Sequence, residues 1–477
     1  MIQSRRAQIA FSLLIIAVAA VTLIFSLSSS PRPKVLWGQL LQVHGLPSHN
    51  LTFGSDIFSV SCASAGNCSA GGSYALDAKR NQAFVVNETN GKWGAAQEVP
   101  GFTSRDAGEN TEVYAVSCPT SGNCSAGGSY SLGPNDTLVF VVSETNGVWG
   151  RAIEVPGSAV LDRGGGGFIT SISCASAGNC SAGGILQAAD VSLDSGAFVV
   201  NETNGKWGQA QELTGPPTFN KGAAGVDSIS CPTISNCSAA GSFKVGPHGA
   251  SSFVVRETNG VWGRIQVVPG LNALNVGVDS ELRSISCAAS GDCTVVGQYA
   301  EKSGYTQAFI ASESGGVWGN AFKVPGLSHL NGRSLSSLVT VSCESGNNCS
   351  AGGFYQTSGN QVAFIVNEVN GTWDKFITIA GLRALDHGHT SYVQTISCSS
   401  PGNCGASGDY GYTSGAFLVN EIDGTWGSVT PIRGMHNLKA SSAAVLSISC
   451  SATTSCSAAG SFSSANNNGA FVVSTVP

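Results

Sequence analysis

Cysteine is the residue whose number and spacing point most directly to chemistry in this chain. The sequence contains 16 cysteines, arranged as pairs in which the second cysteine always follows the first after five residues. In an oxidising compartment, an even set at constant spacing indicates a disulfide framework. Zinc sites favour closer spacings and need four converging ligands, and no histidine recurs with these cysteines. We therefore predict no metal site and no cofactor, and disulfides within the pairs Cys62–Cys68, Cys118–Cys124, Cys174–Cys180, Cys231–Cys237, Cys287–Cys293, Cys343–Cys349, Cys398–Cys404 and Cys450–Cys456.

A second group of reactive side chains is concentrated between residues 386 and 412. It comprises Asp386, His387, His389, Tyr392, Asp409, Tyr410 and Tyr412. Tyrosine rings with carboxylates can hold a sugar by stacking and hydrogen bonding. Two histidines with carboxylates can also ligate a metal, and the same residues can form a polar rim that binds nothing. We take this group as the candidate binding site.

The sequence does not identify a reaction. A glycosidase or lyase needs paired carboxylates that face one cleft, or a base with a raised pKa, and sequence alone brings no such pair together. The chain contains no G-x-S-x-G elbow, P-loop or H-E-x-x-H motif. The sequence therefore indicates no catalytic residue and leaves open whether the protein is an enzyme.

The candidate residues lie on a unit that occurs eight times with a period of about 56 residues. One copy, Ser59 to Gly94, reads SVSCASAGNCSAGGSYALDAKRNQAFVVNETNGKWG. The repeat includes every tryptophan of the chain, at Trp37, Trp93, Trp149, Trp207, Trp262, Trp318, Trp373 and Trp426. Such regularity predicts one repetitive domain that spans residues 35–477.

Each copy is predicted to form four β-strands. SVSC and CSAGGSY flank a turn of small residues, QAFVVNE is a β-branched and aromatic run, and KWGAAQEV follows an Asn-Gly step. Asn-Gly tolerates positive φ, which a tight hairpin between twisted strands requires. No copy shows a sustained helical period, so the chain is predicted to be all-β.

The two ends of the repeat array are complementary. Val35 to Val43 matches the fourth strand without the first three, whereas the last copy ends at Pro477 before its fourth strand. A ring completes its last unit with a strand from the other end, while an open stack needs capping units. We therefore predict an eight-bladed β-propeller of four-stranded blades, whose last blade is closed by the Trp37 strand. The alternative is a β-solenoid, which leaves the mismatch unexplained.

The N-terminal residues predict export. Arg5 and Arg6 precede Ala7 to Leu27, an uncharged apolar stretch that can span a bilayer, so the remainder should be exported. The stretch is longer than a usual signal-peptide core, and only Ser26 to Ser28 resembles a cleavage site. We expect residues 1–27 to be an uncleaved membrane anchor and residues 28–34 a linker. A cleaved signal peptide and a secreted protein are the alternative.

The units SISCASAGNCSAGG and FVVNETNGKWG, with connections such as Gly270 to Asn275, resemble tandem-repeat exported proteins of actinobacteria. The resemblance covers nearly the whole chain and implies a propeller-like secreted protein, without implying an activity. SESGGVWG, Ser312 to Gly319, is more loosely similar to the Asp-box turn of sialidase-like propellers. It lacks the aspartate and is one residue short before tryptophan, so it implies only a hairpin.

Residues that are identical in all copies are needed for the structure of each blade. A unique site must therefore come from positions that vary between copies. These are the connections to the next blade and those between strands two and three, which should share one face. A net charge of −6 without a basic stripe excludes nucleic acid as a partner. We expect a monomeric protein at the cell surface that binds an extracellular protein or glycan. The alternative is a hydrolase or lyase that acts on extracellular polysaccharide.

Overall fold

The structure is a computed structural model of the chain. It describes residues 35–46, 54–102, 110–133, 136–161, 164–188, 195–216, 219, 223–246, 249–274, 279–327, 335–357, 359–411, 415–465 and 468–476. Contacts divide the chain into two units, Met1–Val35 and Leu36–Pro477. The predicted anchor and linker, residues 1–34, lie outside the described residues. Within the described part of the chain, no helix has the length and apolarity needed to cross a bilayer.

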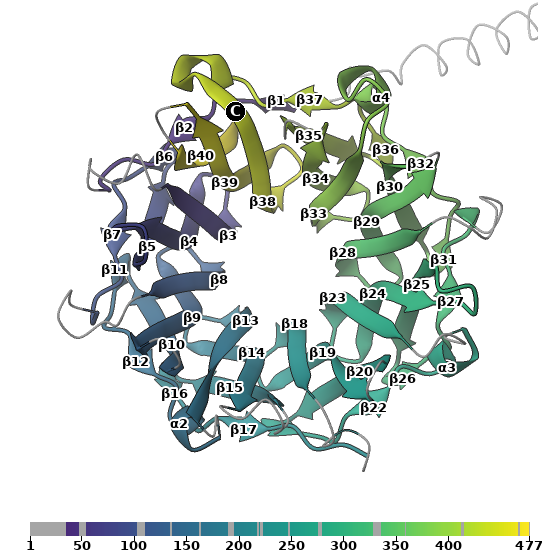
Figure 1. Cartoon of the computed structure of the whole chain (residues 1–477), viewed down its shortest axis with the longest axis horizontal. Helices are drawn as coiled ribbons and strands as arrows, with labels where there is room; N and C mark the ends of the chain where they lie inside the picture. Colours follow the sequence, from purple (N-terminus) through teal and green to yellow (C-terminus); the bar gives the residue numbers. More distant parts are fainter. Residues whose placement is uncertain are drawn as a thin grey trace, which may run out of the picture. The chain divides into compact units, whose positions relative to one another are not determined.

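The unit Leu36–Pro477 is an eight-bladed β-propeller, as predicted, and each blade is an antiparallel sheet (Figure 1). The innermost strands surround the central axis and are β3 (Ser55–Ser64), β8 (Thr111–Thr120), β13 (Gly164–Ser176), β18 (Ala224–Thr233), β23 (Ser280–Ala289), β28 (Ser336–Ser345), β33 (Ser391–Ser400) and β38 (Ala440–Ala452). We number the blades 1 to 8 in this order.

Each innermost strand pairs with a second strand, and that strand pairs with a third. The second strands are β4 (Asn67–Ala75), β9 (Asn123–Gly133), β14 (Asn179–Ala188), β19 (Asn236–Val245), β24 (Asp292–Ala300), β29 (Asn348–Thr357), β34 (Asn403–Tyr410) and β39 (Ser455–Ser464). The third strands are β5 (Asn81–Thr89), β10 (Asp136–Thr145), β15 (Gly196–Thr203), β20 (Gly249–Thr258), β25 (Thr306–Ser314), β30 (Asn360–Val369), β35 (Gly415–Ile422) and β40 (Asn468–Val476).

The predicted fourth strand is present in every blade but is broken into two short strands. The pairs are β6 (Lys92–Trp93) and β7 (Gln97–Glu98), β11 (Val148–Trp149) and β12 (Ile153–Glu154), β16 (Lys206–Trp207) and β17 (Gln211–Glu212), β21 (Val261–Trp262) and β22 (Gln266–Val267), β26 (Val317–Trp318) and β27 (Phe322–Lys323), β31 (Thr372–Trp373) and β32 (Ile377–Thr378), β36 (Thr425–Trp426) and β37 (Thr430–Pro431), and β1 (Leu36–Trp37) and β2 (Leu41–Gln42). Short helices α2 (Ser158–Leu161), α3 (Leu271–Leu274) and α4 (Leu382–Leu385) and the 3₁₀ turn η3 (Met435–Leu438) lie between blades.

The break in the outer strand has a physical cause. At the break, a backbone N–H turns away from its own blade and donates to a carbonyl of the preceding blade, as Ala152 does to Pro100 at 2.6 Å. The same bond occurs at every blade interface, including Ala96 to His44 and Leu40 to Arg433, which involve the closing strands. The outer strand therefore lacks part of the hydrogen-bond ladder within its own blade and bonds to the preceding blade instead.

The ring closes between the two ends of the repeat array. Leu36 and Trp37 pair antiparallel with Val476 and Thr475 of β40, and β2 continues the same pairing further along β40. Trp37 Nε1 also donates to Asn420 Oδ1 of blade 7 at 2.7 Å. This closure confirms the predicted ring and excludes the solenoid.

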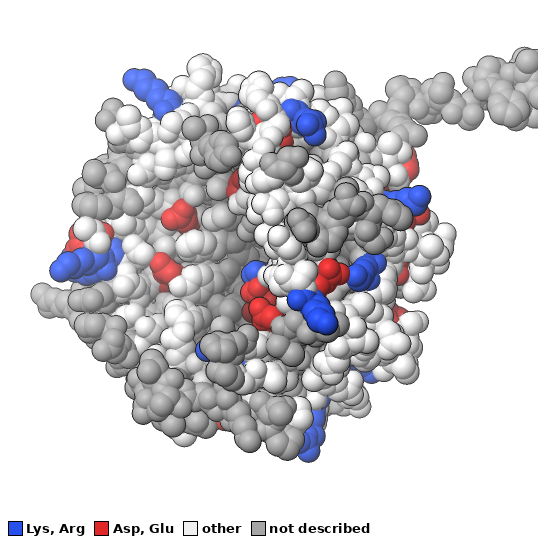
Figure 2. All heavy atoms as spheres, turned by 45° about the vertical axis from the view of Figure 1, so that its right-hand side comes forward, with Lys and Arg blue, Asp and Glu red and all other residues white. Residues whose placement is uncertain are grey.

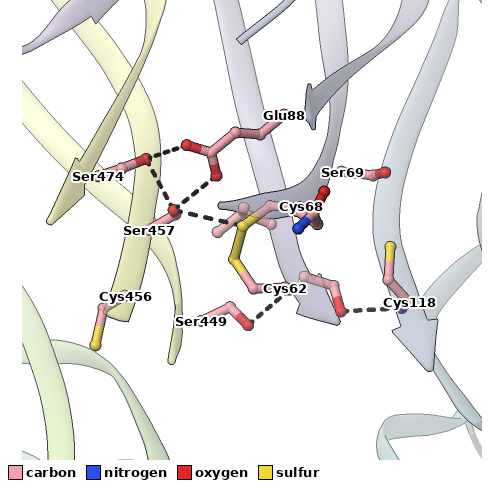
Figure 3. The surroundings of a disulfide bond; sticks show 12 residues. Cys62, Cys68, Ser69, Glu88, Cys118, Ser449, Cys456, Ser457 and Ser474 are labelled. Carbon is pink, nitrogen blue, oxygen red and sulfur yellow. Dashed lines mark hydrogen bonds between the residues drawn. A yellow bond between two sulfur atoms is a disulfide. The ribbon is translucent and has the colours of Figure 1, made fainter. Parts of the chain in front are cut away.

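Serine and glycine near the axis hold the blades together. The serine before each first cysteine accepts a hydrogen bond from the backbone N–H of the next blade's first cysteine. Ser449 does so for Cys62 at 2.9 Å and Ser61 for Cys118 at 3.0 Å (Figure 3). A Cβ atom at Gly71 would lie 2.4 Å from Val113 of the next blade, so only glycine permits this approach.

The eight predicted disulfides are present, each closing the first hairpin of its own blade. No cysteine is free. Blades also share an apolar core, because the phenylalanine of each third strand, from Phe84 to Phe471, is fully buried between neighbouring blades. Full burial of such a side chain stabilises the fold by about 2 to 3 kcal/mol.

Candidate binding site at the mouth of the central channel

The two faces of the propeller are built differently. Both short hairpins of every blade lie on one face, where Gly91 N of the Asn-Gly turn donates to Gly66 O of the cysteine hairpin at 2.8 Å. The connections between the second and third strands, and those between blades, lie at the opposite ends of the strands. We call these the hairpin face and the variable-loop face.

Part of the predicted site is assembled on the channel side of blade 7. Tyr392 of β33 lies opposite Asp409 of β34 in the strand register, and its hydroxyl donates to Asp409 Oδ2 at 2.8 Å. Burial raises the pKa of both groups. The structure thus brings these two predicted residues together, with Asp409 on a strand rather than on the expected loop.

The loop residues of the predicted site lie elsewhere. Asp386 and His389 line a cavity of about 240 Å³ between blades 6 and 7, together with Tyr355 and Arg383. Asp386 is buried and accepts a hydrogen bond from Gly388 N at 2.7 Å, so its carboxylate fixes the loop.

The remaining predicted residues do not join a single patch. The His387 side chain is exposed at a backbone position with φ of 52°. Tyr410 packs against the blade 7 core, and its ring occupies the space beside Gly415. Tyr412 lies outside the described residues. The six described residues thus divide between a pair on neighbouring strands, a loop cavity, the core and, for His387, the exposed surface.

A different set of residues varies from blade to blade at the mouth of the channel. Each innermost strand carries one fully buried apolar residue, and these are Ile57, Val113, Ile169, Val226, Leu282, Leu338, Val393 and Val445. The residues before them are Asp56, Glu112, Phe168, Gly225, Glu281, Ser337, Tyr392 and Ala444, and those after them are Phe58, Tyr114, Thr170, Asp227, Arg283, Val339, Gln394 and Leu446. We call these two flanking sets the channel ring.

Strand geometry turns the channel ring away from the blade cores. Successive side chains of a strand point to opposite faces, so the two flanking residues share the face that the buried residue does not use. In every blade the second flanking residue also sits at a β-bulge, as Phe58 does between Ile57 and Ser59. A bulge leaves its extra residue unpaired and re-aims the side chain. All ring residues except Gly225 and Ser337 keep part of their surface exposed.

Blades 1 to 3 supply an aromatic arc to the channel ring. The ring centroids of Phe58 and Tyr114 are 5.6 Å apart, and those of Tyr114 and Phe168 are 6.4 Å apart. The Tyr114 hydroxyl donates to Glu112, which also accepts from Asn81 Nδ2 at 2.8 Å. The arc is therefore a fixed aromatic surface with one oriented carboxylate.

Blades 4 and 5 supply a charged arc. Arg283 donates to Glu281 Oε2 at 2.8 Å, and Gln298 Nε2 donates to the same oxygen at 3.0 Å. Burial, reinforced by the negative charge of Glu281, raises the pKa of Asp227 to about 7. A carboxyl group that stays partly protonated near neutral pH can donate as well as accept a hydrogen bond.

Carboxylates dominate the ionisable groups at the channel mouth. The channel ring contains Asp56, Glu112, Asp227 and Glu281, but Arg283 is its only basic residue. In the space-filling view, acidic side chains stand around a hollow near the middle of the face in view (Figure 2). Within the described ranges, no group of three or more His, Cys, Asp or Glu residues is arranged to hold a metal ion.

Buried glutamates on the hairpin face join neighbouring blades and do not form a binding site. Glu88 Oε1 accepts from Ser474 at 3.0 Å and Glu88 Oε2 from Ser457 at 3.3 Å, both in blade 8 (Figure 3). In blades 1 and 2, Asn87 donates to Glu144 and accepts from Trp149. The third-strand glutamates are buried in seven blades, and their shared contacts join one blade to the next.

Most of the channel ring was absent from the predicted site, because that prediction considered the variable loops and not the innermost strands. The signal was present in the alternation within the innermost strands. Across the copies, the position of Ile57 is always Ile, Val or Leu, whereas its neighbours range from aspartate to phenylalanine. A strand whose buried positions are uniform and whose other face varies between repeats indicates a binding surface.

Comparisons with known proteins find similar solved structures but no family. No family model matches the chain, and no curated protein matches it. Chaetomium thermophilum Sqt1 bound to the N-terminus of the ribosomal protein L10 is 12% identical, with a TM-score of 0.49, over 93% of this chain and 99% of that one. The Dos1 propeller is 9% identical, with a TM-score of 0.47, over 92% and 95%. A polysaccharide lyase described as an ulvan lyase is 10% identical, with a TM-score of 0.42, over 86% and 98%.

Proposed function

We propose that the protein is an exported β-propeller that binds a protein or glycan partner at the cell surface through its variable-loop face. On its repeat motifs, we group it with the exported tandem-repeat proteins of actinobacteria that it resembles. Eight disulfides support export, because such bonds persist in oxidising compartments. We further propose that Ala7 to Leu27 remains as a membrane anchor, which the mass of the mature protein tests.

One observation carries the binding function. In the innermost strand of each blade, a residue with no exposed surface is apolar in all eight copies, while the residues beside it differ in charge, size and polarity. The buried position is sufficient to pack the blades. The packing of the buried residue therefore does not explain the chemical variety of the channel ring, and a partner that contacts this face supplies a reason.

A paired labelling experiment tests which face meets the partner. All native cysteines are bonded, so an introduced cysteine supplies a single thiol for a bulky polyethylene glycol. Thr357, exposed at the end of β29, marks the variable-loop face, and Thr89, exposed in an Asn-Gly hairpin, marks the hairpin face. We expect the label at Thr357→Cys to block binding on a glycan array or to captured surface proteins, and the label at Thr89→Cys to leave it intact. The reverse pattern contradicts the proposal.

The charged arc supports a second candidate, a hydrolase that acts on extracellular polysaccharide. Asp227 and Glu281 lie on adjacent innermost strands, and Asp227 has a pKa near 7 that suits a general acid. A lyase is less well supported, because its uronate substrate would face the carboxylates of the channel ring. Release of reducing sugar from a polysaccharide panel tests this candidate. Release that disappears in Asp227→Asn supports it, whereas binding without release supports the first proposal.

A further inference from the structure

We infer that the channel ring is a saccharide site, in which the aromatic arc stacks against a sugar ring and the charged arc binds its hydroxyl groups. The ligand class is a saccharide without carboxylate or sulfate groups. This inference rests on the proposed binding function and specifies the ligand at the same face.

The aromatic arc is not needed for packing. Phe58, Tyr114 and Phe168 are all partly exposed, and none belongs to a core cluster formed by the described residues. The bulge position that holds Phe58 and Tyr114 is occupied by Thr170 in blade 3 and by Val339 in blade 6 without loss of the fold. Three aromatic side chains that contact one another across three blades form a continuous, partly exposed apolar surface, which is the kind of surface on which a sugar ring stacks.

The two arcs face each other. Blade 1 lies across the ring from blade 5, because β3 and β23 are four blades apart in an eight-bladed circle (Figure 1). A saccharide chain long enough to span the channel mouth would therefore contact Phe58 on one side and Glu281 and Arg283 on the other. A pyranose has both properties, since its C–H face is apolar and its rim carries hydroxyl groups that donate and accept hydrogen bonds.

The carboxylates are arranged for hydroxyl groups rather than for cations. Glu112 is engaged by Tyr114 and Asn81, and Glu281 is paired with Arg283. Arg283 compensates the charge of Glu281, whereas Tyr114 and Asn81 hold Glu112 by neutral hydrogen bonds. Both carboxylates retain acceptor sites in fixed directions. The remaining acidic groups repel anions, which excludes uronates and sulfated sugars.

Calorimetric titration of the purified full chain tests the inference. The probes are neutral tetrasaccharides of glucose, mannose and N-acetylglucosamine, a galacturonate tetramer and tetralysine. We expect at least one neutral tetrasaccharide to bind with little dependence on salt, and the galacturonate tetramer not to bind. Phe58→Ala and Tyr114→Ala should each weaken binding at least about tenfold.

Two variants separate stacking from other effects. Tyr114→Phe keeps the aromatic ring but loses the bond to Glu112, so its affinity should stay within about threefold of the native value. Val148→Ala removes an exposed apolar side chain beside an Asn-Gly turn on the hairpin face, outside the channel ring, and should not change affinity. Thermal melting of each variant confirms that it is folded.

The inference is overturned if no neutral tetrasaccharide binds, if tetralysine or the galacturonate tetramer binds instead, or if Val148→Ala weakens binding as much as Phe58→Ala. Failure here is distinguishable from failure of the proposed function. If the label at Thr357→Cys still blocks a partner while the aromatic variants change nothing, the variable-loop face binds by its loops and only the saccharide assignment is lost.

Discussion

The hairpin face of this propeller repeats the same contacts from blade to blade, whereas the channel mouth carries different residues in each blade. On the hairpin face the same contacts return from blade to blade: a disulfide, a serine that bonds to the next backbone N–H, and a buried glutamate beside a tryptophan. At the channel mouth, the strands that carry these contacts present a different pair of residues in every blade. The contrast occurs within single strands, because Ser61 of β3 joins two blades while Phe58 of the same strand lines the channel.

The difference shows which positions are free to acquire a function. Contacts between blades constrain a residue on both sides, so a change in one copy disturbs two blades. Most residues of the channel ring keep part of their surface exposed, and eight different residue pairs occupy these positions in the same fold. Substitutions on the hairpin face should therefore change stability, and substitutions in the channel ring should change binding.

Removal of residues 35–43 should have the largest effect on stability. It deletes β1 and β2, which leaves an unpaired edge on β40 and breaks the bond between Trp37 and Asn420. We expect either no folded protein or a melting temperature lower by at least about 10 °C. Leu41→Ser, at an exposed position of the same strand, is the control and should melt normally. Equal melting of the truncated and native proteins would show that closure does not hold the ring.

The interface between blades 4 and 5 is the exception on the hairpin face. There Arg256 forms an ion pair with the buried carboxylate of Glu313, whereas other blades place Asn or Ser at this position. Arg256→Ala should leave a buried charge unpaired and cost about 4 kcal/mol in unfolding free energy. Arg256→Asn recreates the common arrangement and should cost less than half as much. Equal losses in denaturant titration would mean that packing, rather than charge, decides the effect.

Because of Glu421, the free energy of unfolding of the propeller should decrease as the pH rises. Burial raises its pKa from the usual 4.5 to about 7, so between these values the folded state holds a proton that the unfolded state has released. The stabilisation is fully present below pH 4.5 and is lost as the pH rises towards 7. Glu421→Gln should reduce this loss by on the order of 3 kcal/mol, as measured by denaturant titration across pH. Asp374→Asn, exposed in blade 6, is the control and should keep the native slope.

A single disulfide should contribute less. Replacement of Cys62 and Cys68 by alanine should cost about 2 kcal/mol, because the bond closes a loop of only a few residues. The equivalent double variant of Cys398 and Cys404, in blade 7 with Tyr392 of the channel ring, should lose a similar amount. Ligand binding by the folded fraction should be unchanged in both. A selective loss of binding in blade 7 would show that the hairpin face and the channel mouth are coupled.

Much of the fold follows from the sequence. The cysteine pairs, the Asn-Gly turns and the unmatched Trp37 strand predict blades, disulfides and closure, because each depends on residues close together in the chain or on the repeat itself. The broken outer strand was not predictable. It depends on the carbonyl of the preceding blade, such as Pro100 for Ala152, and no local pattern reveals that partner.

The candidate site was predicted less well. Of the predicted residues, Tyr392 and Asp409 lie together, since neighbouring strands of one blade bring them into register. The aromatic arc joins Phe58, Tyr114 and Phe168 from three blades, and sequence separations of about one repeat conceal such contacts. Asp386 resembled a ligand-binding residue because of its neighbours His387 and His389, but it is buried and fixes its own loop.

The smallest effect on stability is expected in the channel ring, where Tyr392→Phe removes only the bond to Asp409. The loss should be about 1 kcal/mol at pH 7, less than for a disulfide, because the aromatic ring and its packing remain. Val393→Ala, at the adjacent buried position, is the matched comparison and should cost about 3 kcal/mol.

The cost of Tyr392→Phe should also depend on pH, which distinguishes the hydrogen bond from general packing. The Tyr392 hydroxyl donates to Asp409, and this bond lowers the pKa of a carboxyl group that burial otherwise raises. In Tyr392→Phe the pKa of Asp409 should therefore rise further. Below that pKa, Asp409 is protonated and accepts a weaker hydrogen bond, so the cost of the substitution should shrink as the pH falls. Denaturant titrations at several pH values measure this trend. A cost that does not change with pH and equals that of Val393→Ala would show that Tyr392 stabilises the propeller by packing rather than by its hydrogen bond.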